Sequence, residues 1–291
     1  MRAEARARTG GILLVVLAGC SFASIGIFNR FAAARGVDVP TALALRFALA
    51  ALLLWALVPR RHGVRLPRAR LGGLALMGAL FVLEAGLFFV SSRRIPVALT
   101  VLLLYLYPAH VLVLAWLLRG ERPGRGGLLA LVLALGGIAL AIGFPATRLD
   151  PLGVALGLAS SVGYAFYMFL GARLQRGVPA LVSTLWISTF ATLVFLALAP
   201  FLGGIHPALG AGAWASVAGL AVLGTVVPTV LVMEGLSRIS ATQASIACTV
   251  EPVAAALLGA LLLGEHLRAP QLAGGALVIA AVLVLSLGDR S

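Results

Sequence analysis

The chain has 291 residues, of which 62% are hydrophobic and 11% charged. Soluble domains are about 45–50% apolar and about 25% charged, so a soluble fold could not cover this much apolar surface. The net charge of +13 comes from arginine alone, and the arginines stand in short gaps between apolar runs instead of forming one basic face. The composition therefore predicts a membrane protein and argues against nucleic acid as a partner.

Ten stretches of the chain are apolar over about 20 residues, the length that crosses a bilayer as a helix. Charged residues, proline or glycine bound each stretch, and the connections are short. We therefore expect an all-α, polytopic membrane protein with ten transmembrane helices. The expected spans are 11–30, 40–59, 71–92, 95–118, 127–144, 151–172, 179–203, 212–236, 241–263 and 270–287.

The first stretch has two interpretations. Arg2, Arg6 and Arg8 precede an apolar run that reaches Cys20, a pattern typical of a bacterial lipoprotein signal with a lipid-acceptor cysteine. The apolar run nevertheless continues to Phe28, a length that favours an uncleaved membrane span.

The distribution of arginine predicts the orientation, because positive residues are retained on the cytoplasmic side of a membrane. With the N-terminus inside, the inner segments hold fifteen arginines and the outer segments hold six. Both termini are therefore predicted to be cytoplasmic, in the cytoplasmic (inner) membrane of a bacterium.

The two halves of the chain share a pattern. A shift of 144 residues aligns 94–121 with 238–265 without a gap and pairs the Arg-Ile dipeptides, the mid-span prolines and the terminal Gly-Glu dipeptides. We expect two five-helix repeats, 1–147 and 148–291. Because five is odd, the second repeat crosses the membrane in the opposite sense, an arrangement that recurs in secondary transporters.

The residues of these motifs are similar to those of the drug/metabolite transporter superfamily, in particular its ten-helix members with two EamA-type repeats. The resemblance covers nearly the whole chain. It implies export of amino acids, related metabolites or toxic compounds through a cavity bordered by spans one, three, four, six, eight and nine. The motifs that carry it are Arg46-Phe47, Arg94-Ile95, Leu104 to Pro108, Gly120-Glu121, Gly224 to Pro228, Glu251-Pro252 and Gly264-Glu265.

Ionisable groups inside a bilayer are costly, so each is a functional candidate. Glu84 lies mid-span between Phe81 and Phe88, where it could bind an amine or a proton, or serve as a buried structural partner. Glu251 and its first-half counterpart Tyr107 each precede a proline whose missing N–H leaves a carbonyl unpaired. We expect both to line a cavity.

The remaining polar groups in the spans have less specific signals. His110 lies on the same helical face as Tyr107 and could bind substrate, relay a proton or be held by a neighbour. All four tyrosines fall in spans four and six, where each hydroxyl needs a partner from a wet cavity or from helix packing. They are Tyr105, Tyr107, Tyr164 and Tyr167.

Other residues are interpreted as structural. Arg46 is close enough to the start of its span to snorkel outward or to pair with a helix end. A second group consists of ion-pair partners at span ends and of prolines that kink helices. These are Glu234, Arg238, Glu121 and Glu265, and Pro108, Pro228 and Pro252.

These features predict a secondary transporter that exports amino acids or similar small metabolites by alternating access. A passive channel or scaffold is the alternative, and an intramembrane enzyme is disfavoured because no nucleophile or zinc motif is found. We expect no cofactor and no metal. The expected partners are a small-molecule substrate and lipid, with proton coupling left open and the chain either a monomer or a weak homodimer.

Overall fold

A computed structural model describes residues 2–60, 62–122, 124–143, 150–264 and 266–287. These residues form helices and connections without a strand, and ten helical spans are long and apolar enough to cross a membrane. The predicted all-α, ten-span architecture is confirmed. The observed spans begin and end within a few residues of the expected ones, except the first, which begins at Arg6.

The first five spans contain seven α-helices. Two of these spans are interrupted, the first at Ala23 and the fourth between Leu104 and Tyr107. The helices are α1 (Arg2–Phe22) and α2 (Ser24–Ala33), α3 (Val39–Leu57) with the 3-10 turn η1 (Val58–Arg60), α4 (Arg68–Ser92), α5 (Val97–Leu104) and α6 (Tyr107–Arg119), and α7 (Arg125–Ile142).

The last five spans also contain seven α-helices. The eighth span is interrupted by a π-helical segment, and the ninth is broken between Cys248 and Glu251. The helices are α8 (Pro151–Leu174), α9 (Ala180–Leu198) with η2 (Ala199–Leu202), α10 (Ala211–Ala221), the π-helical η3 (Val222–Val226) and α11 (Val227–Leu236), α12 (Ala241–Cys248) and α13 (Glu251–Leu263), and α14 (Ala269–Leu287).

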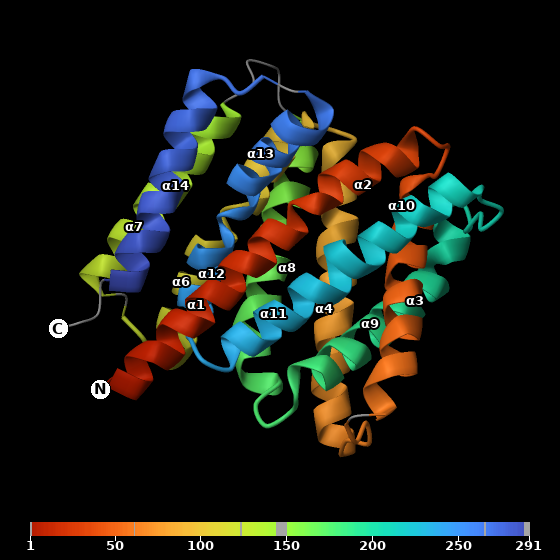
Figure 1. Ribbon diagram of the computed structural model, residues 1–291, viewed down its shortest axis with the longest axis horizontal. Coiled ribbons are helices and arrows are strands. Elements are labelled where there is room, and N and C mark those ends of the chain that lie inside the picture. The colour runs from red at the N-terminus through yellow and green to blue at the C-terminus, as the bar shows by residue number, and fades with distance from the viewer. Residues whose placement is uncertain (1, 61, 123, 144–149, 265, 288–291) are drawn as a thin grey trace.

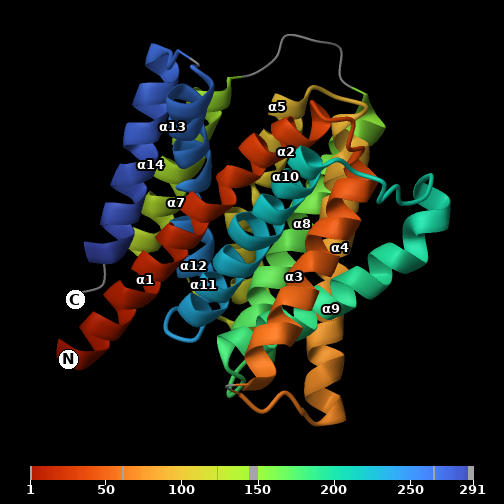
Figure 2. The same ribbon diagram turned by 45° about the vertical axis from the view of Figure 1, so that its right-hand side comes forward.

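The spans pack in a pattern that pairs the two halves. α7 and α14 lie side by side at one edge of the molecule, α3 packs against α9, and the pair α4 with α8 has a counterpart in α1 with α11 (Figures 1 and 2). The beginning of α1 and the end of α14 lie at the same side of the molecule, as an even number of crossings requires (Figure 1).

Glycine allows the closest of these contacts. A Cβ atom on Gly137 of α7 would lie 2.6 Å from the carbonyl oxygen of Gly274 in α14, so only glycine permits this approach. The contact between α7 and α14 therefore depends on these two glycines.

The Arg-Ile dipeptides each cover a glycine of the other half. A Cβ atom on Gly153 would lie 2.7 Å from Cγ2 of Ile95, and one on Gly11 would lie 2.8 Å from Cγ2 of Ile239. The connection before the fourth span therefore packs against the beginning of the sixth span, and the connection before the ninth span packs against the beginning of the first span.

Candidate functional site

A cavity of about 390 Å³ lies among the spans. Its deep part is bordered by Arg46, Glu84 and Glu251, and it extends toward Asn29 near the end of α2 and Ser92 at the end of α4. The full lining is Phe22, Ile25, Asn29, Val39, Leu43, Arg46, Phe47, Phe81, Glu84, Ala85, Phe88, Phe89, Ser92, Leu104, Tyr105, Tyr107, Tyr164 and Glu251.

The opposite ends of the same spans are packed. Met77 of α4, Met168 of α8 and Met233 of α11 are each 0% exposed. Nε2 of Gln175 donates a 2.6 Å hydrogen bond to the Met233 carbonyl and ties the end of α8 to α11. The cavity therefore reaches from the middle of the spans toward one end of the molecule, the end at which α2 stops and α3 starts.

Two broken helices deliver Tyr107 and Glu251 to the cavity. Each residue is the first of its helix, α6 or α13, and each is followed by a proline that fits the second position because its missing N–H has no partner there in any case. At both prolines, for which the sequence predicted kinks, the structure starts a new helix after two non-helical residues. The helices then end at Gly120 and Gly264, both with φ of +67°.

The two carboxylates lie in a mostly apolar and aromatic setting. Glu84 is 8% exposed, and the Ser160 hydroxyl donates to its backbone carbonyl from α8 at 3.1 Å. Glu251 interacts with the hydroxyl of Tyr105 and with the charge of Arg46. A charge in such surroundings is costly unless a partner or a ligand balances it, so both carboxylates are suited to bind a cationic group.

Arg46 is buried inside the helical bundle. It is 7% exposed, borders the cavity and donates from Nη2 to the Gly224 carbonyl at 2.7 Å and from Nε to Thr225 Oγ1 at 2.5 Å. The sequence offered outward snorkelling or a bond to a helix end. The side chain instead points inward, to a carbonyl in the middle of the eighth span. Arg46 instead places a positive charge beside the two carboxylates.

The tyrosines form a connected aromatic group. The Tyr107 and Tyr164 rings meet edge to face at 4.7 Å, and Tyr167 stacks on Tyr164 at 5.7 Å and on Phe81 at 5.2 Å. Tyr105, Tyr107 and Tyr164 line the cavity, whereas Tyr167 lies behind them.

His110 lies outside the cavity lining. Its Nδ1 is 2.9 Å from the hydroxyl of Ser161 in α8, so the neighbour-held alternative describes its position in this structure.

The charged residues assigned to span ends have local partners. Glu234 Oε1 accepts from Arg238 at 2.6 Å, one helical turn away, and Glu121 pairs with Arg119 at 3.5 Å. Glu265 lies outside the described residues. The described His, Cys, Asp and Glu side chains contain no group of three or more that could hold a metal ion.

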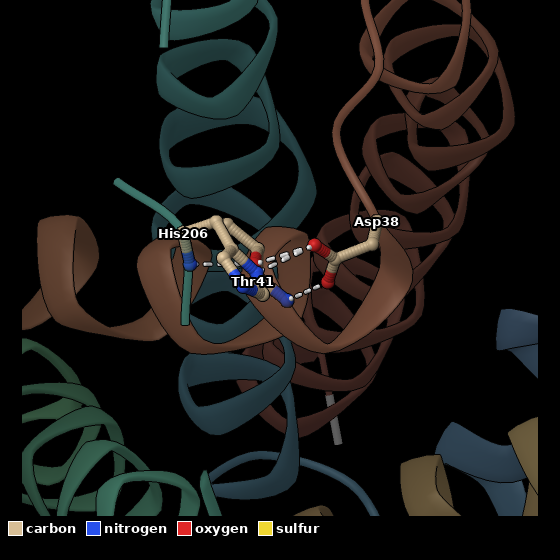
Figure 3. A network of polar contacts seen from close by, with 3 residues as sticks. All are labelled: Asp38, Thr41 and His206. Atoms are coloured by element: carbon tan, nitrogen blue, oxygen red, sulfur yellow. Dashed lines mark hydrogen bonds and ion pairs between the residues drawn. The ribbon is translucent and has the colours of Figure 1, made fainter. Parts of the chain in front are cut away.

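A polar cluster of Asp38, Thr41 and His206 lies at the start of α3 (Figure 3). This is the end of the molecule to which the cavity extends. Asp38, which caps α3, accepts from the Thr41 backbone N–H at 2.8 Å and from its hydroxyl at 2.9 Å, and lies 3.3 Å from Nδ1 of His206. Burial raises the pKa of Asp38, but these hydrogen bonds outweigh it and the pKa is lowered overall. The cluster ties the connection before α10 to α3, beside the cavity residue Val39.

Sequence reasoning missed several cavity residues. Phe22 and Asn29 of the first span and Val39, Leu43 and Phe47 of the second line the cavity, so the second span borders it in addition to the expected ones. Asn29 is the single asparagine of the chain, a signal that could have singled it out. The eighth span contributes through its bonds to Arg46.

Comparisons with known proteins agree with this architecture. A model of the EamA-like transporter family matches residues 9–143 and again residues 151–287. A solved crystal structure with 20% sequence identity superposes with a TM-score of 0.81 over 97% of this chain and 98% of that chain, which shows a shared fold.

Relatives are similar over nearly the whole chain. An uncharacterized protein of Pseudomonas aeruginosa is 37% identical over 96% of this chain and 95% of its own length. An uncharacterized transporter of Archaeoglobus fulgidus is 31% identical over 94% of this chain and 95% of its own length. A threonine/homoserine exporter of Escherichia coli is 28% identical over 87% of this chain and 82% of its own length.

Proposed function

Because the chain belongs to the EamA-like transporter family, we propose that it is a secondary exporter of amino acids or related small zwitterionic metabolites. Membership of this family, with relatives named as transporters, makes the chain a multi-pass membrane transporter and not an enzyme. The substrate and the mechanism are our proposal, and the charged groups of the cavity carry it.

The cavity combines one guanidinium with two carboxylates. Arg46 is suited to bind the carboxylate of a zwitterion, since guanidinium and carboxylate form charge-assisted, often bidentate, hydrogen bonds. Glu84 and Glu251 are suited to bind its ammonium group. Phe81, Phe88 and the tyrosines supply apolar and aromatic surface for the rest of the molecule.

The charge balance also supports proton coupling. When all three groups are ionised, one positive and two negative charges leave a net charge of −1 around the cavity. A bound zwitterion adds no net charge, but its ammonium group gives a carboxylate a positive partner. When the substrate leaves, that carboxylate loses this partner and can take up a proton, which it releases when the next substrate arrives. Glu84 and Glu251 are the proposed proton carriers.

Alternating access fits the shape of the cavity. It extends toward one end of the molecule, and the methionines Met77, Met168 and Met233 pack the other end. With the N-terminus in the cytoplasm, the open end is the external one. We propose that residues 1–147 and 148–291 form two repeats of opposite orientation that exchange these roles during transport, a proposal supported by the paired packing of the spans.

Reconstituted vesicles test the proposed transport. Wild-type protein should show saturable counterflow of radiolabelled L-threonine or another amino acid of a panel, and Glu84→Gln should lose at least about tenfold of the rate, as expected for losing a charged hydrogen bond. Tyr167→Phe, which changes a residue behind the cavity wall, is the matched control. Transport that does not saturate would indicate a channel, and absence of transport for the whole panel would contradict the proposed substrate class.

Labelling tests the orientation. In a background with Cys20→Ala and Cys248→Ala, single cysteines at Arg65 and Arg268 should react with a membrane-impermeant reagent from opposite sides. Reaction from the same side would contradict the inverted arrangement.

A further inference from the structure

The eighth span changes its hydrogen-bond spacing beside the cavity. In the π turn (Val222–Val226) the Val227 N–H bonds to the Val222 carbonyl, five residues back, whereas α11 continues with the four-residue spacing of an α-helix. Pro228, the second residue of α11, has no N–H to donate. The missing N–H of Pro228 removes the helical donor for a carbonyl four or five residues earlier, that of Gly224 or Leu223.

Side chains from two other spans bind these carbonyls. The Ser21 hydroxyl of α1 donates to the Leu223 carbonyl at 2.6 Å, and Nη2 of Arg46 donates to the Gly224 carbonyl at 2.7 Å. Unpaired backbone carbonyls are expensive in a bilayer, so both bonds stabilise the turn.

Thr225 strengthens the link between Arg46 and the π turn. Its hydroxyl accepts from Nε of Arg46 and donates to the Leu220 carbonyl at 2.9 Å. Arg46 therefore contacts the side chain and the backbone of the π turn at once.

The remaining donors of Arg46 face elsewhere. Nη1 makes no hydrogen bond to a described residue and is not among the buried atoms that lack a partner, while Arg46 itself borders the cavity with Glu84 and Glu251. One edge of the guanidinium is thus bonded to the π turn, and another is open to a molecule in the cavity.

We propose that Arg46 is a positioning residue that transmits the binding of the substrate's acidic group to the π turn of the eighth span. This inference rests on the proposed function. The carboxylate first meets the open edge of the guanidinium. Because a carboxylate binds guanidinium more strongly than a backbone carbonyl does, a fork of two hydrogen bonds to the substrate then takes Nη2 away from Gly224. The Gly224 carbonyl then has to find another partner, and the π turn rearranges.

The surroundings of Gly224 carry this change into the first span. A Cβ atom on Gly224 would lie 2.9 Å from Cγ1 of Ile25 in α2, so the backbone of the π turn touches this helix directly. Ile25 and Asn29 of α2 line the cavity. A rearranged turn therefore moves a wall of the cavity, which couples occupancy to opening and closing.

Two sets of variants of the full chain test the inference, with L-threonine and its amide as probes. Arg46→Gln should weaken L-threonine binding about tenfold to a hundredfold, the effect of losing a charged hydrogen bond, and change binding of the amide, which lacks the carboxylate, much less. Arg46→Lys should recover part of the lost affinity, because it keeps the charge without the fork of donors.

Pro228→Ala tests the link to the π turn itself. Alanine restores an N–H at position 228, so the turn depends less on Arg46. Arg46→Gln should lower the melting temperature at least twice as much in the chain that keeps Pro228 as in the chain that carries Pro228→Ala. A third variant carries Cys20→Ala, Cys248→Ala and Ser92→Cys, so that the cysteine at position 92 is its single thiol. Saturating L-threonine should protect this thiol from a thiol-reactive label when Arg46 is present, and should not protect it when Arg46→Gln is added.

The outcomes separate this inference from the proposed function. Equal losses for L-threonine and its amide, additive melting shifts in the two backgrounds, or unchanged protection at Ser92 in Arg46→Gln would overturn the role of Arg46. If the wild type binds neither L-threonine nor any other amino acid, the proposed function fails. The melting comparison still reports on the π turn in that case.

Discussion

The fourth and ninth spans have the same backbone and different chemistry. Both break after eight helical residues, restart after two non-helical residues and end at a left-handed glycine. The first residue after the break is Tyr107 in one span and Glu251 in the other. The Tyr107 hydroxyl donates to the Ser245 carbonyl of α12 at 3.0 Å, whereas the carboxylate of Glu251 borders the cavity near Arg46.

This difference separates architecture from function. The breaks follow from proline at the second position of α6 and α13 and occur in both halves. The side chain beside the break decides whether the position holds two spans together or presents a charge to a solute. Four predictions test this distinction, from the largest expected effect to the smallest.

Glu251→Gln and Tyr107→Phe should separate transport from stability. Glu251→Gln removes a charge from the cavity and should lower transport at least about tenfold, with little change in melting temperature. Tyr107→Phe leaves the Ser245 carbonyl unpaired and should lower stability by about 1–2 kcal/mol, with transport of the folded protein within a few fold of wild type. Vesicle transport and thermal unfolding measure both effects, and identical profiles would remove the distinction.

Gly153→Val and Gly11→Val should destabilise the protein to a similar degree. Each new side chain meets an Arg-Ile dipeptide of the other half, and such overpacking costs about 1–3 kcal/mol. Gly26→Val is the control, because a Cβ atom at Gly26 has no neighbour within 4 Å. Thermal unfolding measures the loss. A large loss at only one of the two glycines would show that the two contacts do not stabilise the protein equally.

Gly120→Ala and Gly264→Ala should have matched effects of about 1 kcal/mol each. Both glycines have φ of +67°, where a Cβ atom is strained, and neither has a neighbour within 4 Å of a built Cβ. Melting temperatures of the two variants should fall together with little change in transport. A loss of transport in one of them would assign a role beyond ending a helix.

Asp38 and Asp150 should give the smallest effect, seen only in acid. Asp150 caps α8, and its hydrogen bonds with Arg94 and the Leu152 N–H lower its pKa. Burial raises the pKa of Asp38, but its hydrogen bonds with Thr41 and His206 have the larger effect and lower that pKa overall. A lowered folded pKa stabilises the protein above the ordinary value of 3.8, and this contribution is lost as the pH falls through the folded pKa. Asp38→Asn should reduce the acid dependence of melting below about pH 4, by about 0.5 kcal/mol. If Asp38→Asn leaves the dependence of melting temperature on pH unchanged, the hydrogen bonds of Asp38 do not stabilise the protein in this way.

Much of the site followed from residue type and depth. Glu251 and Tyr107 were predicted to line a cavity, and a cavity was one of the two interpretations of Glu84, Tyr105 and Tyr164, because polar groups in the middle of a span need water or a partner. All five line the cavity. His110 and Tyr167 satisfied the same rule, but His110 lies against the Ser161 hydroxyl outside the cavity lining and Tyr167 stacks on the Tyr164 ring behind it. Depth along a helix does not tell which side of it faces the hollow.

Local patterns in the sequence were enough for the ten spans, the two broken helices and their glycine ends, because each depends on hydrophobic length, on the missing N–H of proline or on the freedom of glycine. The place of Arg46 was decided only in the tertiary structure. Its partner is a carbonyl 178 residues away, left unpaired by a π turn and by Pro228. A side chain's direction in a membrane depends on the nearest unpaired polar group in space, which the distance to the end of its own helix does not reveal.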